Sequence, residues 1–174
     1  MSLPGNGKVP VFFTRKAVPA DSNSIAEIYN QGIEDRIATF ETASRTGDDI
    51  RKWFDGVHPV VVAESGGSIV SFDATFPYCD RECYSGIAEF SVYVKREMRG
   101  IGAGKAVMRL LIEESGRSGF HKLISRVFPE NRPSRSLLGS LGFREVGIYE
   151  KHARLDGKWR DAVIVEYMIS ENLV

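Results

Sequence analysis

The sequence predicts a single-domain α/β protein with a mixed, mostly antiparallel sheet of about seven strands, flanked by about four helices. Two pairs of strand-like stretches are joined by glycine-containing turns, Gly66-Gly67 and Asp156-Gly157, which is typical of antiparallel hairpins. A strand at 85–96 runs directly into a glycine-rich loop and a helix, which places a strand–loop–helix unit at the centre of the chain. The length of 174 residues and the 43% of hydrophobic residues suit one core.

The first half of the chain is expected to hold one strand, two helices and a hairpin. Residues 11–18 (VFFTRKAV) alternate as a strand, and a helix that begins at Asp21 or Ser22 follows. Residues 46–56 indicate a short second helix, and 58–76 a hairpin around the glycine pair. The residues that give the first helix an apolar face are Ile25, Ile28, Tyr29 and Ile33.

The second half is expected to alternate strands and helices before a closing hairpin. After the strand at 85–96, a helix is expected at 103–119, a strand at 121–128, a second helix at 132–142 and a long hairpin at 143–169. The predicted order is therefore β-α-α-β-β-β-α-β-α-β-β. The residues spaced to face the core from the helix at 103–119 are Ala103, Val107, Leu110 and Leu111.

Composition narrows the classes of function. The 23 basic and 23 acidic residues balance, so no overall field attracts nucleic acid or a membrane surface. No apolar run approaches the ~20 residues of a membrane span, and the N-terminus lacks an apolar signal core, so we expect a cytoplasmic protein. Cys79 and Cys83 are expected as isolated thiols, and the scattered histidines predict no metal site. We expect a flexible N-terminal extension at 1–10 and one domain at 11–170.

The glycine-rich stretch REMRGIGAGKAVM at 96–108 predicts an anion-binding loop. Alternating glycines let backbone N–H groups converge on a phosphate, and the helix that follows adds its positive end. The spacing excludes a P-loop, because Arg99 stands where its first glycine belongs and Ala106 replaces its Ser or Thr. The dinucleotide fingerprint G-x-G-x-x-G also fails, at Lys105 and at Val107. The alternative to an anion-binding loop is a glycine-rich turn without a ligand, in which Arg99 is solvated.

Two motifs resemble the GNAT superfamily of N-acetyltransferases. RGIGAG at 99–104 matches its signature (Q/R)-x-x-G-x-(G/A), and ENRPSRSLLGSLGF at 130–143 resembles its second motif, E-N-x-x-(A/S)-x-x-L-(Y/H)-x-x-x-G-F. Within the superfamily, IYNQGIEDRIATFE, AEFSVYV and GKWRD look like phosphinothricin acetyltransferases. DRIATFET, RECYSGIAEFSVYV and SRVFPEN look closer still to arsinothricin N-acetyltransferases. The resemblance covers roughly residues 13 to 169.

The resemblance implies that acetyl-coenzyme A (acetyl-CoA) is the cosubstrate and that no metal takes part. Its pyrophosphate would be the anion that the loop holds, with the backbone of the strand at 92–94 pairing with the pantetheine arm. Asn131 resembles the asparagine that bonds the pantetheine amides, and Ser140 lies where the helix lines the cofactor tunnel. The residues expected to contact the cofactor are Val92, Tyr93, Val94, Arg99, Gly100, Ile101, Gly102, Ala103, Gly104, Lys105, Asn131 and Ser140.

Glu89 is the candidate catalytic base, because an ammonium must lose a proton before it can attack a thioester. Strand alternation puts Glu89 and Tyr93 on one face and Phe90 on the other. The alternative for Glu89 is a structural ion pair with Arg126 on the adjoining strand. A backbone N–H near Val92 would meet the oxyanion.

The general acid for the leaving thiolate is unassigned. Leu138 stands where the second motif usually carries Tyr or His. Tyr149, His121 or solvent could take the role, whereas His152 is expected on a hairpin surface.

The acceptor implied by the resemblance is a small anionic amino acid such as phosphinothricin or arsinothricin, whose acetylation gives resistance to an antimetabolite. Arg81 would hold its oxyanion, Phe40 and Tyr84 would wall its carbon chain, and Glu89 would meet its amine. Arg81 could instead be a solvated loop charge. Two further functions stay open: acetylation of another amine (a methionine sulfoximine-like amino acid, a polyamine or a protein N-terminus), and non-catalytic acyl-CoA sensing. The subgroup also implies a homodimer, with acceptor sites near the subunit contact.

Overall fold

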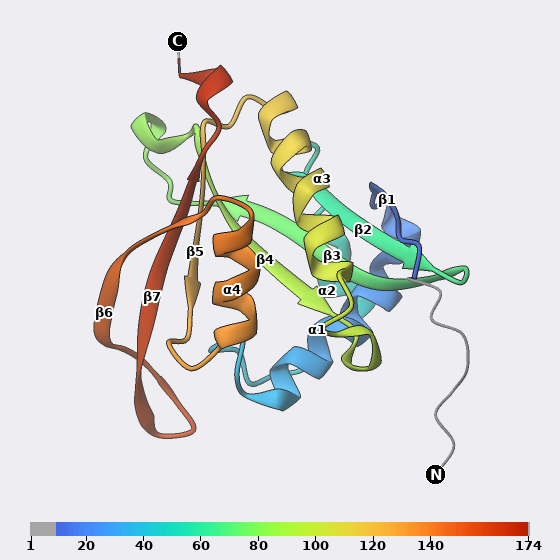
Figure 1. The fold of residues 1–174 in the computed structure, drawn as a ribbon, viewed down its shortest axis with the longest axis horizontal. Helices are drawn as coiled ribbons and strands as arrows, with labels where there is room; N and C mark the ends of the chain where they lie inside the picture. Colours follow the sequence, from blue (N-terminus) through green and yellow to red (C-terminus); the bar gives the residue numbers. More distant parts are fainter. Residues whose placement is uncertain (1–9, 174) are drawn as a thin grey trace.

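The computed structural model describes residues 10–173, and Figure 1 shows the predicted order of elements. Of the expected N-terminal extension, residues 1–9 lie outside the described part. The predicted α/β fold, with seven strands and four α-helices in the described residues, is confirmed. The elements are β1 (Phe13–Lys16), α1 (Ser22–Asp35), α2 (Gly47–Arg51), β2 (Val60–Ser65), β3 (Ser68–Pro77), β4 (Ile87–Val94), α3 (Ala103–Arg117), β5 (Lys122–Val127), α4 (Arg132–Ser140), β6 (Arg144–Leu155) and β7 (Lys158–Met168).

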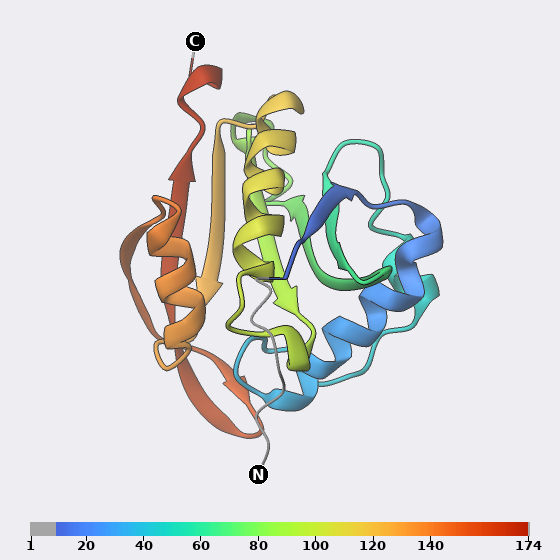
Figure 2. The ribbon, with the colours of Figure 1, turned by 45° about the vertical axis from the view of Figure 1, so that its right-hand side comes forward.

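The strands form one sheet in the order β1-β2-β3-β4-β5-β7-β6. Every neighbouring pair is antiparallel except β4 and β5, which run parallel because α3 connects them across one face of the sheet. Figures 1 and 2 show α3 and α4 on one face and α1 with α2 on the other. The only parallel pair in the described sheet therefore lies at its centre.

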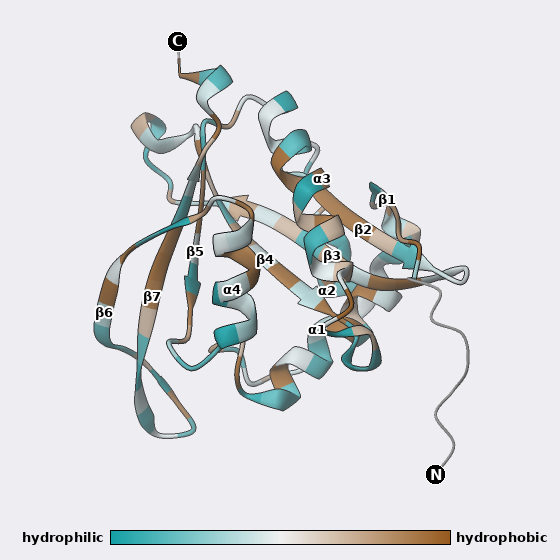
Figure 3. Cartoon of the chain, viewed as in Figure 1, coloured by the Kyte–Doolittle hydropathy of each residue, from teal (hydrophilic) through white to brown (hydrophobic). Residues whose placement is uncertain are grey.

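Each face of the sheet has its own apolar cluster, and Figure 3 shows hydrophobic residues concentrated in the central strands. Under α3 and α4, the cluster includes Phe90, Leu111 and Leu138. Under α1 and α2, it includes Ile28, Phe72 and Tyr93. The two clusters thus clamp β4 from both sides, which fixes the strand that carries Glu89.

The ends of the first helices differ from the expectation in detail. Asp21 stands at the N-cap of α1, but its side chain makes no capping bond and instead accepts hydrogen bonds from Arg15 and from the amide of Val18. The second helix is shorter than predicted and begins after Thr46, whose hydroxyl accepts a bond from the amide of Asp49. The ion pair with Arg15 thus takes the Asp21 side chain away from the α1 amides, whereas Thr46 makes the capping hydrogen bond that its residue type favours.

Asp73 is a buried carboxyl group on β3 that packs under α3. Its residue is 0% exposed, and neither carboxyl oxygen has a hydrogen-bond partner within the described residues. Burial raises the pKa of Asp73 well above its usual range, and the nearby amide of Ala74 offsets this only in part. The folded protein therefore holds the proton on this carboxyl group to a higher pH than an exposed aspartate would.

We predict that Asp73 makes the protein less stable as the pH rises. The unfolded chain ionises the group above its usual pKa of 3.8, whereas the folded chain holds the proton to higher pH. The free energy of unfolding thus falls by up to ~1.4 kcal/mol per pH unit between those two pKa values. Urea unfolding of the wild type and Asp73→Asn at several pH values from 5 to 8 checks this. A variant with the wild-type pH slope would contradict it.

Candidate active site

The β4–β5 pair opens partway along its length. The two strands are in register only from Ile87 with Lys122 to Glu89 with Ile124, so the β4 segment that follows has β3 on one edge alone. The amide of Lys95 donates to β3 at Val70 (2.8 Å). By alternation, the N–H and C=O groups of even-numbered β4 residues point to the open edge.

Two of the three carbonyl groups along this edge are already satisfied. Ser125 Oγ donates to the carbonyl of Phe90 (2.8 Å), and Arg99 Nε donates to that of Val94 (3.1 Å). Val92 lies between them, with its N–H and C=O directed to the same side. The structure thus offers a polar strand edge of the kind that an extended amide chain can pair with.

The glycine loop lies at the end of this edge and leads into α3. Gly100 and Gly102 have positive φ angles of 77° and 99°, and Gly102 is the N-cap of α3. No side chain caps the helix. Its first backbone hydrogen bond runs from the amide of Ala106 to the carbonyl of Gly102. The amides before Ala106 therefore point out of the helix end. These orphan donors, together with the helix dipole, fit a pyrophosphate.

Gly104 has a different role, which is to let three elements approach each other. A Cβ atom there would lie 3.1 Å from Leu137 Cδ2 and 3.2 Å from Val94 Cγ2. The start of α3 therefore packs close to α4 and to the end of β4. This contact holds the orphan amides beside the open strand edge.

Arg99 lies at the predicted place but already has a partner. Its guanidinium group forms an ion pair with Asp35 at the end of α1 (2.6 Å), and Asp35 also binds Arg96 (2.9 Å). Burial acts to raise the pKa of Asp35, but the hydrogen bonds from Arg96 and Arg99 outweigh it, so the pKa is lowered. Arg99 thus ties the loop to α1, and it would share its charge between Asp35 and a phosphate.

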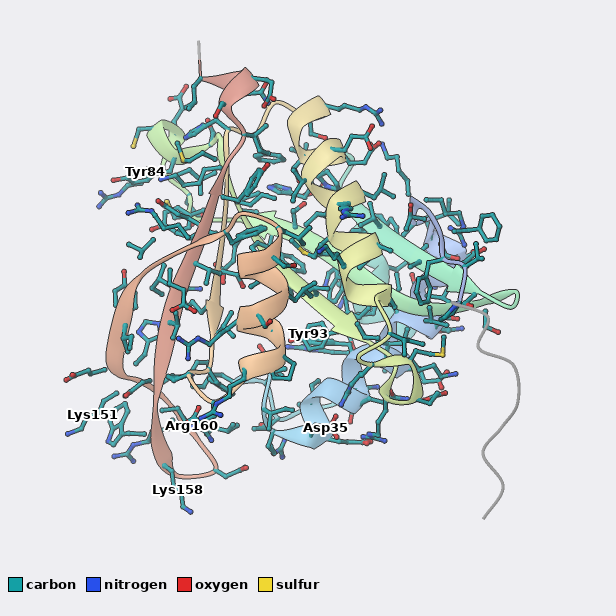
Figure 4. The ribbon with its side chains drawn as sticks, in the orientation of Figure 1. Asp35, Tyr84, Tyr93, Lys151, Lys158 and Arg160 are labelled. Carbon is teal, nitrogen blue, oxygen red and sulfur yellow. The ribbon has the colours of Figure 1, made fainter. Side chains whose placement is uncertain are left out.

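Tyr93 presents its backbone to β3 and its side chain to the core. Its ring lies 4.9 Å from that of Tyr29 and 5.4 Å from that of Phe72, and Figure 4 labels it at the centre of the molecule. Burial raises the pKa of its hydroxyl group. The predicted alternation of β4 is confirmed, because Phe90, Val92 and Val94 pack on the opposite face.

Glu89 lies at the last position of β4 that pairs with β5, where these two strands begin to diverge. Its side chain is 29% exposed, and one carboxylate oxygen contacts the guanidinium group of Arg126. The ion pair considered from the sequence is therefore present. Both partners remain accessible to solvent, so the carboxylate can also be reached by an acceptor amine.

The polar side chains of the second motif already make hydrogen bonds within the chain. Asn131 Oδ1 caps α4 by accepting from the amide of Ser134, and its Nδ2 donates to the carbonyl of Ile37 (both 3.2 Å). Ser140 lies on an exposed turn of α4 and donates to the carbonyl of Leu137 (2.7 Å). Leu138 is 1% exposed in the core, so the position where the family carries Tyr or His has no proton to give.

Neither alternative general acid lies along the open edge. Tyr149 is half-exposed on the edge strand β6, where its ring lies 5.0 Å from that of His152. His121 precedes β5 and packs beside Gly86, at the end where β4 and β5 are still paired.

The residues predicted to hold the acceptor fall into two separate groups. The Phe40 ring packs edge-on against that of Phe128, with 4.8 Å between the ring centroids. The guanidinium group of Arg160 stacks over the Phe128 ring, 4.8 Å from its centroid. Tyr84 packs instead against Tyr78 (5.8 Å), in the exposed segment between β3 and β4 that also holds Arg81. Figure 4 labels Tyr84 and Arg160 at opposite ends of the sheet. One chain does not bring Phe40 and Tyr84 together.

A pocket of about 400 Å³ opens on the face that Glu89 shares with α1 and α2. Phe76 forms part of its wall and is directly opposite Glu89 in the β3–β4 register. Sequence reasoning did not include this pocket, because its walls come from three separate segments without a shared motif. Its lining residues are Tyr29, Glu41, Arg45, Asp49, Lys52, Trp53 and Phe76.

Two other features of the described residues bear on the class of protein. No set of three or more His, Cys, Asp or Glu side chains is placed to hold a metal ion, and Cys79 and Cys83 are exposed thiols. Across the described residues, none of the helices has the length and apolarity to cross a membrane.

An uncapped helix end, an open strand edge beside it and a carboxylate at the start of that edge form an arrangement that suits an acyltransferase with a phosphate-bearing thioester as its donor. Residues 25–143 match the acetyltransferase (GNAT) family. The chain belongs to this family and is an acetyl-CoA-dependent N-acetyltransferase.

Individual relatives cover almost the whole chain. YwnH of Bacillus subtilis is 30% identical over 155 residues, which are 87% of this chain and 95% of YwnH. An L-methionine sulfoximine/L-methionine sulfone acetyltransferase of Salmonella typhimurium is 26% identical over 162 residues (91% and 95%). The crystal structure of a phosphinothricin acetyltransferase from Sinorhizobium meliloti, in complex with acetyl-CoA, is 27% identical, with a TM-score of 0.83 and coverage of 90% and 88%.

Proposed function

We propose that this enzyme moves the acetyl group of acetyl-CoA to the α-amine of a small anionic amino acid of the phosphinothricin or arsinothricin type. The observation that carries the proposal is Glu89, a solvent-accessible carboxylate at the point where β4 loses its β5 partner. The substrates named for the Salmonella and Sinorhizobium relatives support the amino-acid class.

In this proposal, acetyl-CoA supplies the activated acetyl group, and the residues of the chain hold it and move one proton. The amides of Gly102 to Lys105 face the pyrophosphate, and the β4 edge pairs with the pantetheine arm. Glu89 accepts a proton from the acceptor ammonium, which frees the lone pair that forms the new N–C bond. The Val92 N–H donates to the carbonyl oxygen as its charge develops, and the C–S electrons leave with the thiolate. The second proton that the nitrogen loses on becoming an amide passes to that thiolate or to water.

The proposal includes a homodimer. Arg81 and Tyr84 lie on an exposed segment far from Phe40, so a single subunit does not enclose an acceptor with all three. A second subunit would complete the site by placing its segment 78–86 beside Phe40, at the opening between β4 and β5. Sedimentation of the purified protein tests this part, and a monomer at the assay concentration would exclude it.

The acceptor class is tested by a turnover assay that follows the release of the coenzyme A thiol. We expect the highest kcat/KM with arsinothricin or phosphinothricin, then methionine sulfoximine, and little turnover of glutamate or spermidine. Glutamate has a planar carboxylate at the end where phosphinothricin and arsinothricin carry oxygens on a tetrahedral phosphorus or arsenic atom, and spermidine has no such group. Preference for spermidine would indicate another amine class, and acetyl-CoA binding without turnover of any amine would indicate a sensor.

Arg81→Lys tests the contact to the distal oxyanion. Lysine keeps the charge but loses the planar fork, so we expect KM for phosphinothricin to rise about tenfold or more. The KM for acetyl-CoA is expected to stay unchanged. An unaltered KM for phosphinothricin would assign Arg81 to the solvated loop instead.

A further inference from the structure

We propose that Arg126 exchanges partners during the reaction: it pairs with Glu89 in the empty acceptor site and with the α-carboxylate of the acceptor when one is bound. Arg126 would thereby bind the substrate and release the base in one step. The inference rests on the proposed function and names the residue that selects amino acids over other amines.

The register places Arg126 at the mouth of the opening. Glu89 pairs with Ile124, and Arg126 follows two residues later, on the same face of β5. Because β4 and β5 diverge after Glu89, the Arg126 side chain reaches back to the carboxylate from the rim of the opening. Both side chains remain accessible, at 38% exposed for Arg126 and 29% for Glu89.

The chemistry of an amino acid brings its carboxylate to the same place. The α-ammonium and the α-carboxylate are bonded to one carbon atom, so an ammonium at Glu89 puts the carboxylate within a few ångströms of the Arg126 guanidinium group. A planar guanidinium group binds a carboxylate with two parallel hydrogen bonds. The acceptor ammonium in turn gives Glu89 a new cationic partner. One ion pair is thus replaced by two.

The ion pair between Glu89 and Arg126 is of the kind that can exchange. Ion pairs that solvent can reach contribute little to stability, so the fold does not depend on this contact. Elsewhere, Ser125 already joins β5 to the open edge of β4 through the carbonyl of Phe90. The Arg126 side chain is therefore free to turn from one carboxylate to another without loosening the strands.

The neighbouring cations on β5, β6 and β7 already form ion pairs with other carboxylates. Lys122 lies 3.0 Å from Glu166, which Arg144 also contacts. Arg160 lies over Phe128 and 3.2 Å from Glu130. Arg126 differs from them, because within the described residues its only ion-pair partner is Glu89, the proposed base.

The exchange predicts selectivity for a free α-carboxylate. An amine without that group leaves Arg126 on Glu89, where it competes with the incoming ammonium. Removal of Arg126 should therefore weaken catalysis with an amino acid but relieve the competition for an amine that lacks the carboxylate. A residue with a purely structural role would affect both acceptors alike.

The test compares phosphinothricin with its α-carboxamide in the wild type and in Arg126→Gln. We expect the ratio of their kcat/KM values to fall about tenfold or more in the variant, through a higher KM for phosphinothricin. With the carboxamide, kcat is expected to match or exceed that of the wild type. Calorimetry should give unchanged acetyl-CoA affinity. Arg126→Lys, which keeps the charge, should retain part of the preference and provides the comparison if the Gln variant does not fold.

Arg117→Gln is the matched control, since Arg117 pairs with Glu113 and Glu114 at the far end of α3. Its preference should equal that of the wild type. An unchanged ratio in an active Arg126 variant, or an equal loss with both acceptors, overturns the inference alone. A wild type that acetylates no amino acid overturns the proposed function, and the inference with it.

Discussion

Glu89→Gln should lower kcat by about 10²–10⁴-fold at neutral pH. The amide keeps the shape of the side chain and can still accept a hydrogen bond from Arg126, but it cannot take a proton from the acceptor ammonium. Acetyl-CoA binding involves the loop and the strand edge rather than this carboxylate, so its affinity should barely change. Steady-state kinetics and calorimetry on the same preparation measure the two effects.

Glu64→Gln is the matched control for this experiment. Glu64 is also a strand glutamate paired with an arginine, Arg15, at 2.5 Å, and its side chain is 31% exposed against 29% for Glu89. Loss of an exposed ion pair is thus common to both variants. If Glu89→Gln turns over as fast as Glu64→Gln, Glu89 has only the structural role that its contact with Arg126 allows.

Gly102→Val should abolish acetyl-CoA binding. Gly102 has a φ of 99°, in the left-handed region that a β-branched residue rarely adopts, and it is the N-cap residue of α3. Valine would turn the backbone out of this conformation, so the orphan amides would no longer converge on one point. Isothermal calorimetry with acetyl-CoA measures the loss.

Backbone strain by itself must be separated from the loss of the anion site. Gly119, just after α3, has a φ of 87°, and a Cβ atom there would meet no other atom within 4 Å. Gly119→Val therefore imposes similar strain far from the loop. Both variants should unfold at lower temperature, because such strain costs about 1–3 kcal/mol. Only Gly102→Val should lose acetyl-CoA, and equal binding by the two variants would remove the loop from the cofactor site.

The elements of this fold were largely readable from local patterns. The two glycine-containing turns, the alternation along β4 and the apolar spacing on α1 and α3 each depend on residues that are close in sequence. The start of α1 agrees with the sequence, with Asp21 at the N-cap, but the Asp21 side chain accepts from Arg15 rather than from the helix amides. Side-chain competition of this kind does not appear in a propensity pattern.

The candidate site shows the same division. The spacing of the glycines predicts the loop, and the expected adjacency of the two strands makes Arg126 a candidate partner of Glu89. Asp35 as the partner of Arg99 was missed. The two residues are 64 positions apart, and no motif marks the end of α1 as a place for that carboxylate.

The sequence by itself determined the order of the elements, the helix that follows the glycine loop and the face of β4 on which Glu89 lies. These follow from backbone sterics and from periodicity, which act over a few residues. Only the tertiary structure decided that β5 leaves β4 after Glu89, that Arg99 is tied to Asp35, and that Phe40 and Tyr84 lie apart. Those outcomes depend on strand register and helix packing, where each contact joins distant segments and is set by the fit of the whole core.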